Sequence, residues 1–146
     1  MTKRVIDIRL VYHGDQRYDS FADWEDLIDG TLRISVSKVG NWRYEYLTAI
    51  HELLEATLCR HAGVSQAEVD AFDIPFEKCR MEGKRLALCG CEITDDPGMD
   101  RHAPYRDAHI YATSVEYGLA KLLDVDPKEY DQAFIALDGG VAGNRK

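Results

Sequence analysis

The sequence contains no apolar run that approaches the ~20 residues needed to span a membrane. Its first residues, MTKRVIDIRLVYH, alternate charged and apolar side chains and lack the continuous apolar core of a signal peptide. We therefore expect a cytoplasmic protein with no membrane partner. A dense stripe of lysine and arginine is also missing, and the formal net charge is -8. Because an acidic protein repels a phosphate backbone, we expect no nucleic-acid partner.

Cysteines with zinc-ribbon spacing are absent as well. No Cys-x-x-Cys pair occurs, and Cys89-Gly90-Cys91 alone is a weak metal signal. In a reducing cytosol, the interpretation we favour for Cys59, Cys79, Cys89 and Cys91 is buried or half-exposed thiols. Internal repeats, linkers and low-complexity segments are also lacking. We expect one domain over residues 1–138 and a flexible C-terminal tail over residues 139–146.

Alternating hydrophobicity predicts two strands. Residues 4–12 place apolar side chains on one face and, in the middle of the other face, Asp7 and Arg9. Residues 31–39 alternate in the same way. Because each strand has one face expected to be exposed to solvent, the pattern favours an antiparallel sheet. The polar segment between them is expected to hold a short third strand or a helical turn.

A helical period replaces this alternation after Gly40. Asn41 is a candidate N-cap, and Gly63 is a suitable end for the first helix. Its apolar stripe consists of Leu47, Ile50, Leu54 and Leu58. A second helix opens with the capping box of residues 65–68 and can be followed as far as Pro75. Further helices are expected near Pro104 and from Asp126, the former with the apolar stripe Ala108, Ala112, Val115, Leu119 and Leu122. The predicted fold class is α+β, with a small antiparallel sheet followed by three to four packed helices.

The first helix carries a His-Glu-x-x-Glu motif, from His51 to Glu55. With Leu47 as zero, His51 falls at about 40° and Glu55 at about 80° around the helix axis. Both side chains lie on the flank of the buried stripe, where an unpaired charge costs several kcal/mol. A divalent cation removes that cost, because side chains at i and i+4 can share one ion. Glu52 is then the candidate catalytic base that takes a proton from a water bound to the ion.

The helix after Pro104 supplies further candidate ligands. With Ala108 as zero, His109 falls at about 100° and Glu116 at about 80°, so they share one flank. Seven residues separate them by about 10.5 Å along the axis, so one ion can hardly bind both directly. We predict His109 as the third ligand. Glu116 is expected either to support a ligand or to bind a second ion, and Asp73 is a further candidate.

His51, Glu55 and His109 provide two imidazoles and one carboxylate, the ligand set of a catalytic zinc site with an open position. Each residue also has a structural interpretation: a solvated carboxylate, a hydrogen-bonded core histidine, or the polar face of a helix. A carboxylate-rich two-metal site that uses Glu55, Glu116 and Asp73 is a second enzymatic interpretation.

The segments "RISVS…YLTAIHELLEATLCRHAGVS…VDAFDIPFE…APYRDAHIYATSVEYGLAKLL" resemble small proteins encoded by bacteriophages and prophages, over roughly residues 5 to 130. A looser resemblance is to minimal zincin metallopeptidases, in which a short sheet leads into a helix with a His-Glu-x-x-His motif. This resemblance implies a zincin-like fold, with His51 as a ligand, Glu52 as the general base and Glu55 at the second ligand position. Glu55 departs from the zincin pattern, which has histidine at this position. Because a carboxylate is a harder ligand than an imidazole, this departure shifts the expected metal from zinc toward manganese or iron.

These observations predict a zincin-like, metal-dependent hydrolase that acts on a peptide or small-molecule substrate, with zinc, manganese or iron as cofactor. Tyr105 and Tyr111 are candidate oxyanion stabilisers, because they lie close to His109 in the sequence. The alternative is a non-catalytic structural or adaptor protein of a phage, with a buried polar or metal-stabilised core.

Overall fold

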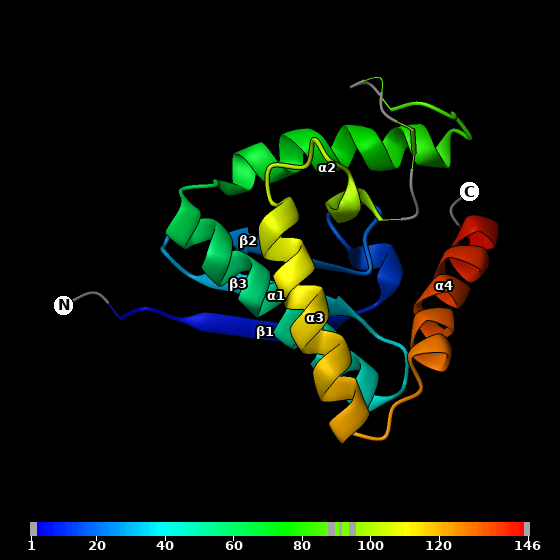
Figure 1. Cartoon of the computed structure of the whole chain (residues 1–146), viewed down its shortest axis with the longest axis horizontal. Coiled ribbons are helices and arrows are strands. Elements are labelled where there is room, and N and C mark those ends of the chain that lie inside the picture. Colours follow the sequence, from blue (N-terminus) through cyan, green and yellow to red (C-terminus); the bar gives the residue numbers. More distant parts are fainter. Residues whose placement is uncertain (1–2, 88–89, 91, 94–95, 145–146) are drawn as a thin grey trace.

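Three strands form a mixed sheet in the order β1-β3-β2. The computed structural model, which describes residues 3–87, 90, 92–93 and 96–144, places β1 at Ile6–Val11, β2 at Ala22–Asp26 and β3 at Leu32–Ser37. A short 3-10 turn, η1 at His13–Asp15, follows β1, so the segment between the two predicted strands contains both a helical turn and a third strand. Four α-helices accompany this sheet, and the first of them packs directly on it, which confirms the α+β class (Figure 1).

The antiparallel prediction is wrong for one of the two strand pairs. β2 runs antiparallel to β3, but β1 runs parallel to it, with Ile8 opposite Ile34. The alternation of hydrophobicity reports which face of a strand is apolar and does not report the direction of its neighbour. The predicted apolar face of β1 is also largely exposed, because the first helix packs on β3 and β2.

The first helix, α1 at Trp42–Ala62, begins and ends as the sequence predicts. The side chain of Asn41 accepts a hydrogen bond from the backbone N–H of Arg43, which otherwise lacks a helical partner. Gly63 ends the helix in the left-handed region at φ 75°, a conformation that glycine adopts without steric cost.

The second helix, α2 at Gln66–Met81, opens with the predicted capping box of Ser65 and Glu68. It continues through Pro75, beyond the point to which the sequence pattern could be followed. A proline inside a helix removes one backbone hydrogen bond. The helix persists because Phe76 and Cys79, on its far side, are buried in the core.

Two further helices complete the described fold. α3 spans Arg106–Leu122 and lies side by side with α1 over the sheet (Figure 1). α4 spans Pro127–Asn144, and Asp126 caps it by accepting from the backbone N–H of Lys128. Its backbone therefore extends into the segment predicted as a tail from residue 139, while the flexibility of that segment stays a prediction.

Two apolar clusters lie at different levels along α1. Ala56 and Cys59 pack with the sheet and α2, in a cluster that includes Ile34 and Val36. Leu47 packs instead with residues around α4, among them Phe134. His51 and Glu55 lie on α1 between these levels, and both are buried.

The most buried line of α1 differs from the predicted stripe. It runs through Leu47, His51, Glu55 and Cys59, whereas Ile50, Leu54 and Leu58 are only partly buried. The candidate ligands therefore lie at the centre of the buried face. Leu122, which the sequence places in the apolar stripe of α3, is 80% exposed.

Among the helices of the described residues, none combines the length and apolar character needed to cross a membrane. Cys59 and Cys79 are free and buried. Cys89 and Cys91 lie outside the described residues.

Candidate metal centre

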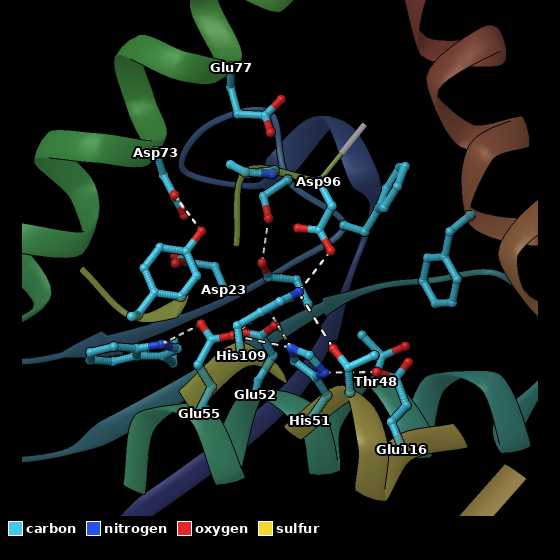
Figure 2. Close-up of a pocket in the computed structure, with 18 of the residues that line it drawn as sticks. Asp23, Thr48, His51, Glu52, Glu55, Asp73, Glu77, Asp96, His109 and Glu116 are labelled. Atoms are coloured by element: carbon cyan, nitrogen blue, oxygen red, sulfur yellow. Dashed lines mark hydrogen bonds and ion pairs between the residues drawn. The ribbon is translucent and has the colours of Figure 1, made fainter. Parts of the chain in front are cut away.

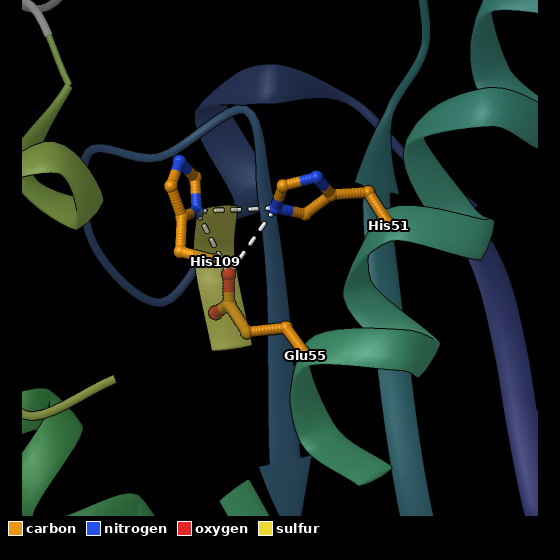
Figure 3. A group of neighbouring side chains, drawn as sticks. All are labelled: His51, Glu55 and His109. Carbon is orange, nitrogen blue, oxygen red and sulfur yellow. Dashed lines mark hydrogen bonds and ion pairs between the residues drawn. The ribbon is translucent and has the colours of Figure 1, made fainter. Parts of the chain in front are cut away.

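Three side chains converge on one point between α1 and α3 (Figure 3). His51 Nε2 lies 3.1 Å from Glu55 Oε2 and 3.2 Å from His109 Nδ1, and His109 Nδ1 lies 2.9 Å from Glu55 Oε2. All three residues are buried. The structure thus brings together the three residues predicted as ligands.

The helices account for this convergence. His51 and Glu55 are separated by one turn of α1, so their side chains point in the same direction. His109 lies near the start of α3, which crosses the same stretch of α1. Its ring packs edge-on against that of His51, with centroids 4.8 Å apart.

Each converging side chain is held from behind by a second residue (Figure 2). The outer nitrogen of His51, Nδ1, lies 2.7 Å from Glu116 Oε1, and the outer nitrogen of His109, Nε2, lies 2.8 Å from Asp96 Oδ2. The remaining oxygen of Glu55, Oε1, accepts a hydrogen bond of 3.2 Å from the indole N–H of Trp24. A carboxylate on the far nitrogen is the usual support of a metal-ligating histidine, because it fixes the tautomer and the ring orientation.

A further layer orients Glu116. Tyr130, on α4, donates a hydrogen bond of 2.5 Å from its hydroxyl to Glu116 Oε2. The same hydroxyl lies 2.7 Å from Thr48 Oγ1, on α1. The last helix therefore contributes to the position of His51 through Glu116.

The loop before α3 holds His109 from two sides. It contains a short 3-10 turn, η2 at Pro97–Met99, and its N-cap Asp96 accepts from the Gly98 N–H as well as contacting His109. Gly98 lies against the face of the imidazole, so that a Cβ at this position would lie 2.5 Å from His109 Cγ. Only glycine fits this close approach without displacing the ring.

The carboxylates around the cluster change its protonation. Burial alone would lower the pKa of His51, but hydrogen bonds with Glu116 and Glu55 raise it to about 11. In the same way, burial opposes protonation of His109, but Asp96 and Glu55 raise its pKa to about 10. Burial would raise the pKa of Glu55, yet the two imidazoles lower it to about 2. Without a metal ion, these shifts favour protonated imidazoles that share the ionised carboxylate of Glu55.

A divalent cation fits this group of atoms. Four-coordinate zinc with bonds of ~2.0–2.1 Å separates its ligand atoms by about 3.3 Å, close to the spacings of 2.9, 3.1 and 3.2 Å found here. The cation would replace the two inward imidazolium protons, and this exchange leaves the net charge of the cluster unchanged. His51, Glu55 and His109 could therefore hold one metal ion.

A cavity of about 440 Å³ borders the three residues (Figure 2). Glu52 lines it from α1, and burial together with repulsion by Glu55 raises its pKa well above the ordinary value. The cavity wall also includes Tyr18 and Tyr117, and many of its other side chains are carboxylates. A carboxylate with a raised pKa beside a candidate metal position has the character of a general base.

The other predicted site residues take different positions. Asp73 lines the cavity from α2, but it accepts hydrogen bonds from Tyr105 and Tyr18, at 2.5 and 3.1 Å, and is outside the group of converging ligand atoms. Tyr105 lies beside the ring of His109, with its hydroxyl proton engaged by Asp73. Tyr111 is 55% exposed and is not among the residues that line the cavity, and its assignment as an oxyanion stabiliser stays a prediction.

The sequence did not indicate Asp96, Trp24 and Gly98 as residues of this centre. Trp24 comes from a strand and the other two from a loop, so helical periodicity does not connect them with His51. An Asp-Pro-Gly turn shortly before a helix was the one visible signal.

Comparison of the chain with protein-family models, curated protein sequences and solved structures finds no match. The chemistry of the centre therefore follows from its own geometry.

Proposed function

We propose that this chain is a zincin-like, metal-dependent hydrolase whose ion is held by His51, Glu55 and His109. One observation carries the proposal. The three inner atoms form a triangle with sides of 2.9, 3.1 and 3.2 Å, and Glu116, Asp96 and Trp24 orient the side chains that bear them. This double layer is typical of metal sites, where outer carboxylates orient the ligating histidines.

The bound cation would act as a Lewis acid toward the carbonyl group of an amide or ester. Glu52 then accepts a proton from the attacking water and returns it to the leaving amine or alcohol. The hydroxyl group of the water stays on the acyl carbon, which becomes the carboxylic acid product. The raised pKa of Glu52 supports the first of these proton transfers, because it makes the ionised Glu52 carboxylate a stronger base than an ordinary glutamate.

The cavity supports a substrate of modest size. Its volume of about 440 Å³ lies in the range of small-molecule sites, ~300–1,000 Å³. A short peptide segment or a small ester is therefore the substrate class that we propose. We expect zinc as the metal. Because Glu55 contributes a carboxylate ligand, manganese and iron are the alternatives. Phage or prophage origin stays a prediction.

Elemental analysis tests the metal centre. The wild-type protein, purified without chelator, should contain about one divalent ion per chain or bind one Zn²⁺ in calorimetry. His51→Ala and His109→Ala should lose this ion, whereas His61→Ala should keep it, because His61 is exposed at the end of the same helix. Equal binding by all three variants, or no binding by the wild type, would contradict the proposal.

Glu52→Gln tests catalysis separately from metal binding. The variant should keep its ion and lose at least about a hundredfold in turnover on a panel of quenched peptides and esters, the size typical of a lost general base. Glu68→Gln, in the exposed capping box of α2, is the matched control. Turnover by Glu52→Gln at the wild-type rate would remove Glu52 from the mechanism.

A second candidate function is a non-catalytic phage protein with a polar core. The observation in its favour is that the same side chains complete a hydrogen-bond network among themselves, with Glu116 on His51 and Asp96 on His109. A folded wild-type protein that binds no Zn²⁺ favours this function. Tight binding without turnover favours a metal-stabilised scaffold.

A further inference from the structure

Strand β1 presents an apolar face that nothing in the described part of the chain covers. Ile8 lies opposite Ile34 of β3, so the two side chains are on the same side of the sheet. Ile34 is fully buried under α1, whereas Ile6, Ile8 and Leu10 are 59%, 50% and 42% exposed. The apolar face of the sheet thus extends from β3, which α1 covers, to β1, which α1 does not cover.

The backbone of this strand is also available for pairing. β1 is an edge strand, and the carbonyls of Val5 and Val11 accept hydrogen bonds from the backbone N–H groups of Leu32, in β3, and Lys38, directly after it. In a parallel pair, alternate residues of a strand direct their backbone groups toward the same neighbour. The odd-numbered residues of β1 therefore face β3, and Ile6, Ile8 and Leu10 direct their N–H and C=O groups to the free edge.

We propose that β1 pairs antiparallel with β1 of a second copy of this chain, about a two-fold axis at Ile8. Ile8 then lies opposite the partner's Ile8, and Ile6 lies opposite the partner's Leu10. The three residues with outward backbone groups form hydrogen-bonded pairs, and the two sheets join into one sheet of six strands. This interface is independent of the proposed hydrolase activity.

The charges of β1 select both the partner and the register. With the axis at Ile8, Asp7 of each copy lies opposite the partner's Arg9, so the dimer contains this ion pair twice. An axis at Asp7 or at Arg9 would place like charges opposite each other, which is destabilising. Pairs at these positions form no backbone hydrogen bonds to each other, so their side chains approach most closely.

The existing contacts of Asp7 leave room for this pair. Arg9 and Arg33 of the same chain both donate to Oδ2 of Asp7, at 2.8 and 3.2 Å. Asp7 and Arg9 are on the sheet face opposite to Ile8, so the ion pairs and the apolar contacts occupy different faces of the joined sheet. Pairing with a second copy gives the outward N–H and C=O groups of β1 partners, so the strand no longer presents an open edge to unspecific pairing.

A charge-swap experiment tests the interface. Light scattering of the full chain over a dilution series should show a dimer that dissociates on dilution. Asp7→Arg and Arg9→Asp should each be monomeric, because each places like charges opposite each other. An equimolar mixture of the two variants should form a heterodimer, and Arg101→Asp, an exposed reversal outside β1, should stay dimeric.

Circular dichroism establishes that each variant is folded before it is mixed. A wild-type protein that is monomeric at the highest concentration overturns the proposal. Folded Asp7→Arg and Arg9→Asp proteins that fail to associate on mixing also overturn it.

Disulfide trapping tests the register without changing a charge. Paired residues at the two-fold axis have Cα atoms about 5.5 Å apart, which is within the range for a disulfide. Ile8→Cys should therefore oxidise to a covalent dimer faster than the wild type. Leu10→Cys should not, because residue 10 lies opposite residue 6 of the partner. Equal rates for the two variants contradict the register.

Discussion

At the residue scale, Gly98 is the position where a single added methyl group should damage the candidate centre. A Cβ there would lie 2.5 Å from His109 Cγ and 2.7 Å from Nδ1, the inner nitrogen. Gly98→Ala must therefore displace either the ring or the loop that carries Asp96. Because loss of an outer partner commonly costs about 10- to 100-fold in metal affinity, we expect a loss of that size for Zn²⁺.

Gly118→Ala is the control for this prediction. Gly118 lies on α3, and a Cβ at this position would meet no atom within 4 Å. Alanine should therefore leave Zn²⁺ binding unchanged and stabilise the helix slightly. Calorimetry of both variants measures the difference. Equal affinities for Gly98→Ala and Gly118→Ala would show that the His109 ring does not need its present position to bind the ion.

The ligand residues were predictable because the helical period fixes their relative positions. One turn separates His51 from Glu55, and burial of an imidazole beside a carboxylate requires a compensating group. The outer partners were not predictable in the same way. Asp96 and Trp24 reach the centre through a loop and a strand, and the path of those segments depends on tertiary packing.

At the element scale, Asp73 is a polar link between α2 and the rest of the cavity wall. It accepts from Tyr18, which follows η1, and from Tyr105, which precedes α3. Burial is the main cause that raises its pKa, from the ordinary 3.8 to about 7. The folded protein thus holds the Asp73 proton more tightly than the unfolded chain does.

This shift predicts a specific pH dependence of stability. As the pH rises from about 4 toward 7, the unfolded chain loses the Asp73 proton first, so the free energy of unfolding falls. Asp73→Asn removes this contribution, worth about 1.4 kcal/mol per pKa unit. Urea unfolding at several pH values should therefore give a flatter profile for Asp73→Asn. The exposed Asp107→Asn is the control, and a profile parallel to that of the wild type for both variants would contradict the assignment.

The helices were easier to predict than the sheet. Asn41, Gly63 and the box of Ser65 and Glu68 act through local hydrogen bonds, which depend on neighbouring residues only. The direction of β1 depends instead on how the chain returns through η1 and β2. An exposed apolar face on an edge strand has the same alternation as a buried one, so the sequence could not distinguish them.

At the scale of the whole molecule, the candidate centre lies where the two apolar clusters meet along α1. Its side chains come from α1 and α3, and their supports come from β2, α4 and the loop before α3. An ion bound there would connect most of the fold. Binding should therefore stabilise the entire protein, by about 2.7 kcal/mol when Zn²⁺ exceeds its dissociation constant a hundredfold. That gain corresponds to a rise of roughly 5–10 °C in the thermal midpoint.

Zn²⁺ should raise the thermal midpoint more at higher pH, and this direction distinguishes binding at the candidate centre from unspecific binding. Without metal, the raised pKa values of His51 and His109, about 11 and 10, stabilise the fold below pH ~6.5, and that stability is lost as the pH rises through those values. Zn²⁺ must displace both inward protons, so its affinity should rise with pH, by up to about a hundredfold per unit. Scanning calorimetry with Zn²⁺ and with chelator should therefore give midpoints that diverge as the pH increases from about 6 to about 8. His61→Ala should behave like the wild type. A difference that is constant with pH, or that also appears in His51→Ala, would mean that the ion binds elsewhere.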